Sequence, residues 1–244
     1  NNTAIGKEAL TTNTSGEKNV AVGNQSLKDN TTGDFNVALG AEALFDNTSG
    51  SNNTATGFFA LGLNTTGSNN VAIGFAALDA NTTADSNTAI GHNSLTTNTT
   101  GSQNTALGRK TLDLNTTASN NTAIGFEALR VNTTGGDNVA VGAFALDANT
   151  TASNNTGVGY AALGTNTTGS NNTSLGFFSS LRNSTGTNNV AVGRSALQEN
   201  TTGFENVAVG NATLDANTTG HTNTAIGASA LGSNTTADNN TAVG

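Results

Sequence analysis

Apolar and polar positions recur with a constant period along this chain. The motif N-[TV]-x-x-G starts at Asn2 and returns at every 17th residue up to Asn240, with no insertion or deletion. This spacing gives 14 complete units followed by the first five residues of another. A fixed period of this kind is the signature of a repeat architecture and takes precedence over local signals. The sequence therefore predicts one continuous repeat array over residues 1–244.

Each unit position, counted from the initial Asn as position 1, has its own residue preference. Position 2 is always Thr or Val, position 3 is nearly always Ala, position 4 is aliphatic except at Thr56, and position 5 is always Gly. Position 9 is Leu in every unit but one, where Ser180 occupies it, and position 12 is always Asn. The segment N-[TV]-A-[IV]-G predicts a short strand that ends in a turn. The NTTG segment predicts a turn or the edge of a second strand.

A unit of 17 residues is too short for the common helical repeats, which start at about 33 residues. We therefore predict an all-β parallel β-solenoid or β-roll with one coil per 17-residue repeat and 14 full coils. Equivalent positions would stack about 4.8 Å apart, as in any parallel sheet. The expected core consists of two aliphatic columns at positions 4 and 9, represented by Ile5, Leu10, Val22, Leu27, Ile73, Leu78, Ile124 and Leu129.

Invariant asparagines have two competing explanations. Stacked Asn side chains at positions 1 and 12 can form hydrogen-bonded ladders between coils. The Asn of position 12 also opens an N-[TS]-[TS] sequence, which is formally an N-glycosylation acceptor if it lies in an exposed loop. The structural explanation is favoured, and glycosylation stays open at Asn13, Asn30, Asn47, Asn64, Asn81, Asn98, Asn115, Asn132, Asn149, Asn166, Asn183, Asn200, Asn217 and Asn234.

Composition narrows the range of functions. The formal net charge is −8, and only 8 Lys and Arg are spread over the chain, so no basic patch for nucleic acid is expected. Without Cys, the chain has neither disulfides nor thiolate metal sites. There is no apolar run of membrane-spanning length, so we expect no membrane contact within this segment. We expect no cofactor and no metal.

An enzymatic function is not expected either. The two histidines, His92 and His221, stand in different columns, and the acidic residues form no invariant column. A paired-carboxylate site of the glycosidase kind is therefore not indicated. The Gly-Gly-x-Gly-x-Asp pattern of calcium-binding nonapeptides is missing as well.

The strings NVAVG, NVAIG and NTAIG, followed by a small residue and Leu, resemble the head repeats of trimeric autotransporter adhesins. The NTAIG…AL…NTTG pattern also looks like arrays in bacterial or phage tail-fibre proteins. This resemblance covers all 244 residues. It implies a left-handed parallel β-roll, often trimeric, on a cell or virion surface. The 17-residue unit and its NTT segment are departures from the adhesin heads.

The sequence as a whole predicts the structural shaft of an extracellular filament, surface adhesin or tail fibre. Because both ends of the chain fall inside a repeat, we expect it to be an excerpt of a longer protein. Self-association is expected, as a homotrimer or an end-to-end fibre. If position 4 faces inward, the Ala column of position 3 faces outward and lets another chain approach closely. The alternative is a ligand-binding solenoid that presents Thr or aromatic columns to surface glycans or to ice.

Overall fold

The computed structural model describes all 244 residues, and they divide into two compact units, Asn1–Asn120 and Asn121–Gly244. Each coil contributes one three-residue strand, and there is no helix. The first unit contains β1 (Thr3–Ile5), β2 (Val20–Val22), β3 (Val37–Leu39), β4 (Thr54–Thr56), β5 (Val71–Ile73), β6 (Thr88–Ile90) and β7 (Thr105–Leu107). The second contains β8 (Thr122–Ile124), β9 (Val139–Val141), β10 (Thr156–Val158), β11 (Thr173–Leu175), β12 (Val190–Val192), β13 (Val207–Val209), β14 (Thr224–Ile226) and β15 (Thr241–Val243).

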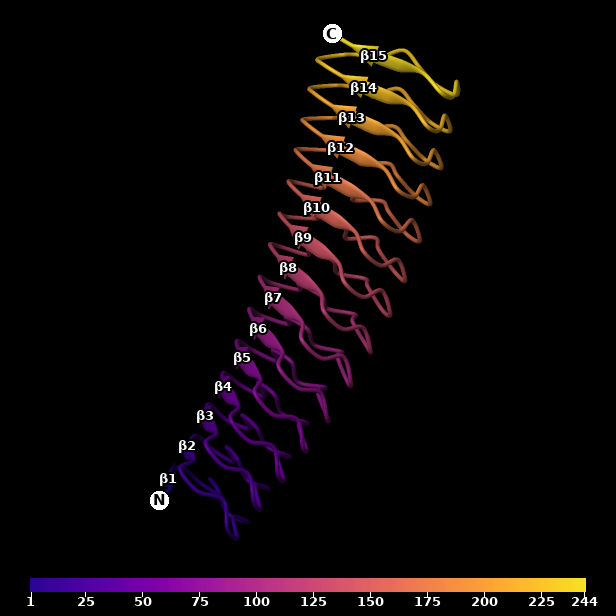
Figure 1. Ribbon diagram of the computed structural model, residues 1–244. Helices are drawn as coiled ribbons and strands as arrows, with labels where there is room; N and C mark the ends of the chain where they lie inside the picture. Colours follow the sequence, from indigo (N-terminus) through magenta and orange to yellow (C-terminus); the bar gives the residue numbers. More distant parts are fainter. The chain divides into compact units, whose positions relative to one another are not determined.

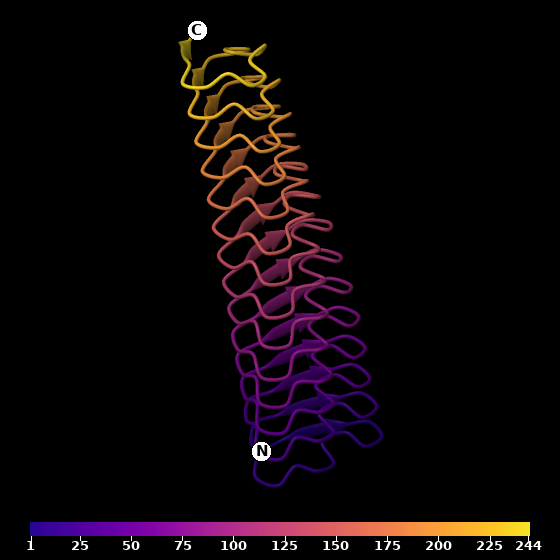
Figure 2. The same ribbon diagram turned by 90° about the vertical axis from the view of Figure 1, so that its right-hand side faces the viewer.

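Within each unit the strands form a parallel sheet in the order of the sequence (Figure 1). The register joins each residue to the one 17 positions later, so that Thr3 pairs with Val20 and Ala4 with Ala21. The same register holds from β8 to β9 and onward through the second unit. The strands therefore lie on one side of the coils, and irregular segments close the other side (Figure 2). The predicted parallel β-solenoid with one coil per repeat is confirmed.

The interior is lined by positions 3, 8 and 9. The Ala of position 3 is fully buried at Ala21 and Ala72, and the Leu of position 9 is fully buried at Leu27, Leu78 and Leu129. Leu10 in the first coil is half-buried. These side chains form the apolar core of the coils, and burial of each Leu is worth about 1.5–3 kcal/mol.

The expected inward direction of position 4 is wrong. Ile5 is 61% exposed, Ile73 is 38% exposed, and Val22 and Ile124 are half-buried. Successive strand residues point to opposite faces, so the burial of the position 3 Ala turns positions 2 and 4 outward together. The Ala column is consequently inside and cannot be the docking surface that the sequence suggested.

Backbone geometry explains the invariant small residues. Gly23 at position 5 has φ of 143°, which a residue with a side chain rarely adopts. Gly33 at position 15 has no such requirement. A Cβ atom there would lie 2.5 Å from Asn30 Oδ1 and would overlap the carbonyl oxygen of Gly50 in the next coil. Close approach of the next coil, and not a positive φ, thus restricts position 15 to Gly or Ala, and at Ala84, Ala118 and Ala152 the neighbouring coil leaves room for one methyl group.

Candidate interaction surfaces

The outward side chains of positions 2 and 4 form an exposed apolar surface, which we call the strand face. It consists of Thr or Val beside Ile, Val or Leu in successive coils, with Thr56 as the one polar residue at position 4. The larger side chains are well exposed, for example Leu107 at 43% and Leu39 at 39%. Within each unit the stacked strands make this face regular (Figure 1).

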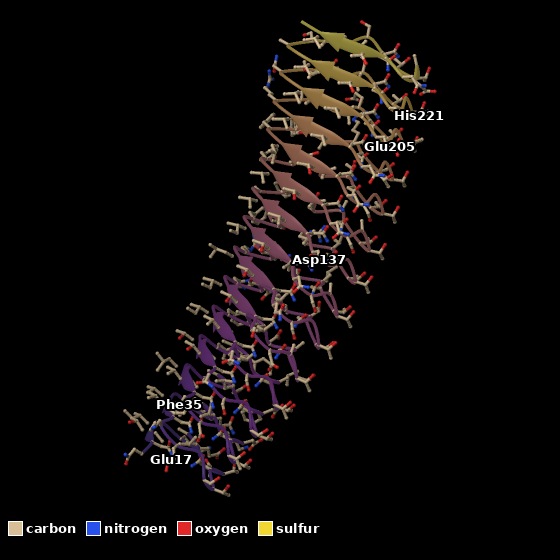
Figure 3. The ribbon with its side chains drawn as sticks, in the orientation of Figure 1. Glu17, Phe35, Asp137, Glu205 and His221 are labelled. Atoms are coloured by element: carbon tan, nitrogen blue, oxygen red, sulfur yellow. The ribbon has the colours of Figure 1, made fainter.

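No charged residue occurs on the strand face in any coil. The chain has 8 basic and 16 acidic residues, which makes 24 charges, and all of them occupy positions 6, 7, 10, 11, 16 or 17. Examples from the start of the strands are Asp137 and Glu205 at position 17, both exposed, which Figure 3 shows near β9 and β13. Six variable outward positions thus carry all the charges, whereas the strand face and the exposed Thr or Ser of position 14 carry none. Exposed apolar surface of this kind commonly marks an interaction site.

A second exposed feature is the row of side chains at position 6, which we call the exit row because the chain leaves the strand there. It carries stacked rings in both units: Phe58 lies 5.5 Å from Phe75, and Tyr160 lies 5.4 Å from Phe177, between ring centroids. His92 continues the first stack at 5.1 Å from Phe75. The faces of these rings are occupied by their neighbours along the row. This arrangement disfavours sugar binding, because sugars stack on open ring faces.

The asparagines of position 12 lie inside the protein. In the interior coils their side chains are fully buried, as at Asn47 and Asn64. Asn47 donates from Nδ2 to Asn30 Oδ1 at 2.8 Å and to the carbonyl oxygen of Gly50 at 3.0 Å. Its Oδ1 accepts from Asn64 Nδ2 at 2.7 Å. A glycan on Nδ2 would displace one of these hydrogen bonds and would need space that the coil lacks, so the geometry disfavours glycosylation of the folded protein at this position.

The asparagines of position 1 form a second ladder. Asn36 donates from its backbone N–H to Asn19 Oδ1 at 2.9 Å, and from Nδ2 to the carbonyl oxygen of Gly50 at 2.8 Å. The carbonyl oxygen of Gly50 therefore accepts hydrogen bonds from both Asn columns. Fully paired buried amides of this kind hold each coil in register with the next one. The stacked Asn columns inferred from the sequence are present.

The Thr pairs of positions 13 and 14 do not present a regular hydroxyl array. The position 13 hydroxyl donates to the position 13 carbonyl oxygen of the next coil, as from Thr31 to Thr48 at 2.8 Å. Only the position 14 residue, such as Thr32, is well exposed. A surface that orders ice needs two hydroxyls per coil on one face. On the strand face, only β4, with Thr54 and Thr56, meets that requirement.

Two half-buried acids and one His–Asp pair are the titratable groups of chemical interest. Burial raises the pKa of Asp79 to about 6 and raises the pKa of Asp147, both at position 10. His221 Nε2 lies 3.2 Å from Asp238 Oδ2 at the start of the strands, on the side where Figure 3 labels His221. No group of three His, Cys, Asp or Glu side chains is placed to hold a metal ion.

Comparison of the sequence with protein-family models gives no match, and comparison with curated proteins gives none either. The structure contains no helix of the length and hydrophobicity needed to cross a membrane.

Proposed function

We propose that this chain is the structural shaft of an extracellular filament, surface adhesin or tail fibre, and that copies of it associate laterally through the strand face. The observation that carries this proposal is the contrast between an exposed face without charges and neighbouring outward positions that hold all 24 charges. A mechanical role is supported by the repetition itself. Within each unit, every coil is joined to the next by the same kinds of backbone and Asn hydrogen bonds, so stiffness is built up one repeat at a time.

The strand face replaces the Ala column as the surface for self-association. Its β-branched and leucine side chains lose little conformational entropy when they pack against a partner. The occupant is a second copy, because a face with the same residues in every coil matches another array of the same period.

The test places one charge on the strand face and a matched charge elsewhere. Leu175→Asp changes a position 4 residue that is 37% exposed, and Thr168→Asp changes an exposed position 14 residue one coil away. Both variants should keep the β-rich circular dichroism of the parent. Sedimentation should show that Thr168→Asp associates like the parent, whereas Leu175→Asp weakens association at least tenfold, since it buries an unpaired charge. Parent protein that stays monomeric at high concentration would sink the proposal.

A further inference from the structure

The strand face cannot by itself determine how two copies align along the stacking direction. Its residues are nearly the same in every coil, so sliding one copy by one coil keeps almost all contacts and removes only those of the terminal coil. Register in parallel sheets is weakly specified wherever the sequence is uniform. Axial alignment therefore requires an aperiodic feature that borders this face.

The exit row is such a feature. Position 6 follows position 4 by two residues and is exposed in most coils, so it borders the strand face on one side. Its residues change from coil to coil, in contrast to those of the strand face. In the second unit it places Phe126, Tyr160 and Phe177 along one edge, at 37%, 44% and 44% exposure. Phe144 packs edge-on between Phe126 and Tyr160, with ring centroids at 5.3 and 5.8 Å, and holds the group together.

The area of the strand face supports a role for these rings in binding. The seven or eight stacked strands of a unit, about 4.8 Å apart and each presenting a width of roughly 10 Å, offer about 350–400 Å². A stable interface needs about 800 Å² per partner. Because these rings are already more than half buried, each can bury roughly 80 Å² more, so a few rings at the edge supply part of the deficit. Buried aromatic residues are also the side chains that most often dominate interface energetics.

We infer that the aromatic residues of the exit row, above all Tyr160 and Phe177, anchor the second copy and fix its axial register. This inference rests on the proposed lateral association. The ring faces are stacked on each other along the row, which leaves their edges and the adjoining strand face for the partner. Displacement by one coil in one direction would bring Arg194 to the partner surface that had contacted Phe177. Displacement in the other direction would bring Ala143 to the surface that had contacted Tyr160.

The experiment compares Tyr160→Ala/Phe177→Ala with Phe35→Ala/Phe204→Ala. The control residues are exposed to a similar degree, 50% and 39%, but lie at positions 17 and 16, on the other side of the strands. The chain has no Cys, so Thr202→Cys, at an exposed position 14, gives a single spin-labelling site in each copy. Sedimentation then measures affinity, and dipolar spectroscopy measures the distance between labels in the assembly.

We expect the control to keep the parent's affinity and one label-to-label distance. The Tyr160→Ala/Phe177→Ala protein should bind at least about 30-fold more weakly, as for a hot spot. At concentrations that restore assembly, its label-to-label distances should broaden, because each one-coil slip changes the axial offset between the labels by about 4.8 Å. An exit-row variant that matches the control in affinity and in its single distance overturns the inference but not the lateral association. A parent protein without self-association overturns the lateral association instead.

Discussion

Two coils of the second unit show how much of this fold depends on its apolar core. Coil 9 (residues 138–154) has the standard interior of Ala140, Ala145 and Leu146, all fully buried. Coil 11 (residues 172–188) has serine at the three equivalent positions. Ser174 Oγ donates to Ser180 Oγ at 2.8 Å, and Ser179 Oγ donates to the carbonyl oxygen of Ala191 at 3.0 Å. The polar interior of coil 11 is thus internally hydrogen-bonded.

The backbone of the two coils is nevertheless the same. The first strand residue donates to the next coil at 2.8 Å in both, from Val139 to Asn155 and from Thr173 to Asn189. The position 12 asparagines donate to the preceding coil at 2.8 Å from Asn149 and at 3.0 Å from Asn183. Loss of the apolar interior therefore leaves the coil geometry intact, which indicates that the hydrogen-bond ladders determine the coil and the Leu column adds stability to it.

On the outer surface of coil 11, aromatic residues pack together beside its polar interior. The Phe177 and Phe178 rings lie 4.0 Å apart between centroids, and Tyr160 packs against both of them. Leu181, displaced by one residue from the usual Leu position, is half-buried. Coil 9 has only Phe144 in the equivalent region. The apolar contacts removed from the interior of coil 11 are in part replaced at its corner.

Removal of one position 12 Asn should have the largest effect on stability. The same substitution in coils 9 and 11 tests whether the Asn ladder stabilises both coils equally. Asn149→Ala removes two donated hydrogen bonds, to Asn132 Oδ1 and to the carbonyl oxygen of Ala152, and takes from Asn166 Nδ2 one of its two acceptors. Unsatisfied buried partners should lower the free energy of unfolding by about 3–6 kcal/mol. Asn183→Ala in coil 11 should lose a similar amount, as measured by urea denaturation.

Asn211→Ala, at the exposed position 6, is the matched control and should change stability by less than about 0.5 kcal/mol. If Asn183→Ala proved nearly neutral while Asn149→Ala did not, the ladder would not be what holds coil 11.

The core itself gives the next largest effect. Leu146→Ala in coil 9 should lower the free energy of unfolding by about 2–4 kcal/mol, from lost burial and the cavity left behind. Ser180→Ala in coil 11 removes no comparable volume and should cost only about 1 kcal/mol, because Ser174 loses its acceptor. Hydrogen exchange would locate each loss in its coil. Equal losses in the two coils would contradict the view that coil 11 depends less on its interior.

The comparison also shows what the sequence could predict. The period of 17, the parallel register and the buried Asn columns follow from residues that never vary, such as the Asn of positions 1 and 12. Stacking of each coil on the next explains why the residues at these positions are constant. The burial of Leu27 and Leu78 follows in the same way, since a large apolar side chain that recurs at one position is expected in the interior of the coil.

The direction of the strand was not predictable by the same argument. Ala at position 3 and Ile or Val at position 4 are both compatible with the interior, and the usual preference for the larger residue inside gave the wrong answer for Ile5 and Ile73. The interior is too narrow for two opposed large side chains, because the Leu of position 9 fills it. Leu27 and its equivalents adopt the left-handed backbone region, with φ of 50° at Leu27. Leu rarely adopts this conformation, so the sequence does not predict it.

Restoring the standard interior of coil 11 should have a moderate effect of opposite sign. Ser174→Ala with Ser180→Leu gives coil 11 the residues of coil 9 at positions 3 and 9. The added burial should raise the free energy of unfolding by about 1–2 kcal/mol. Ser180→Leu alone should gain less, since the Ser174 hydroxyl would stay buried without its acceptor. A double variant less stable than the parent would show that Leu181 and the aromatic corner have repacked the coil around its serines.

The smallest expected effect concerns the acid that coil 9 carries at position 10, where coil 11 has Leu181. Burial raises the pKa of Asp147, and the Arg130 charge partly opposes this rise. The folded protein therefore binds more protons than the unfolded chain between the ordinary and the raised pKa, so stability is highest below the ordinary value and falls as pH rises through the raised one. Asp147→Asn should consequently stabilise the protein at neutral pH, by only a few tenths of a kcal/mol, roughly, because solvent screens the half-exposed carboxylate.

Asp79, whose pKa burial raises to about 6, gives a larger version of the same test. Denaturation midpoints measured from pH 4 to 7, roughly, should fall less steeply for Asp79→Asn than for the parent, and an unchanged slope would contradict the burial of that carboxyl group.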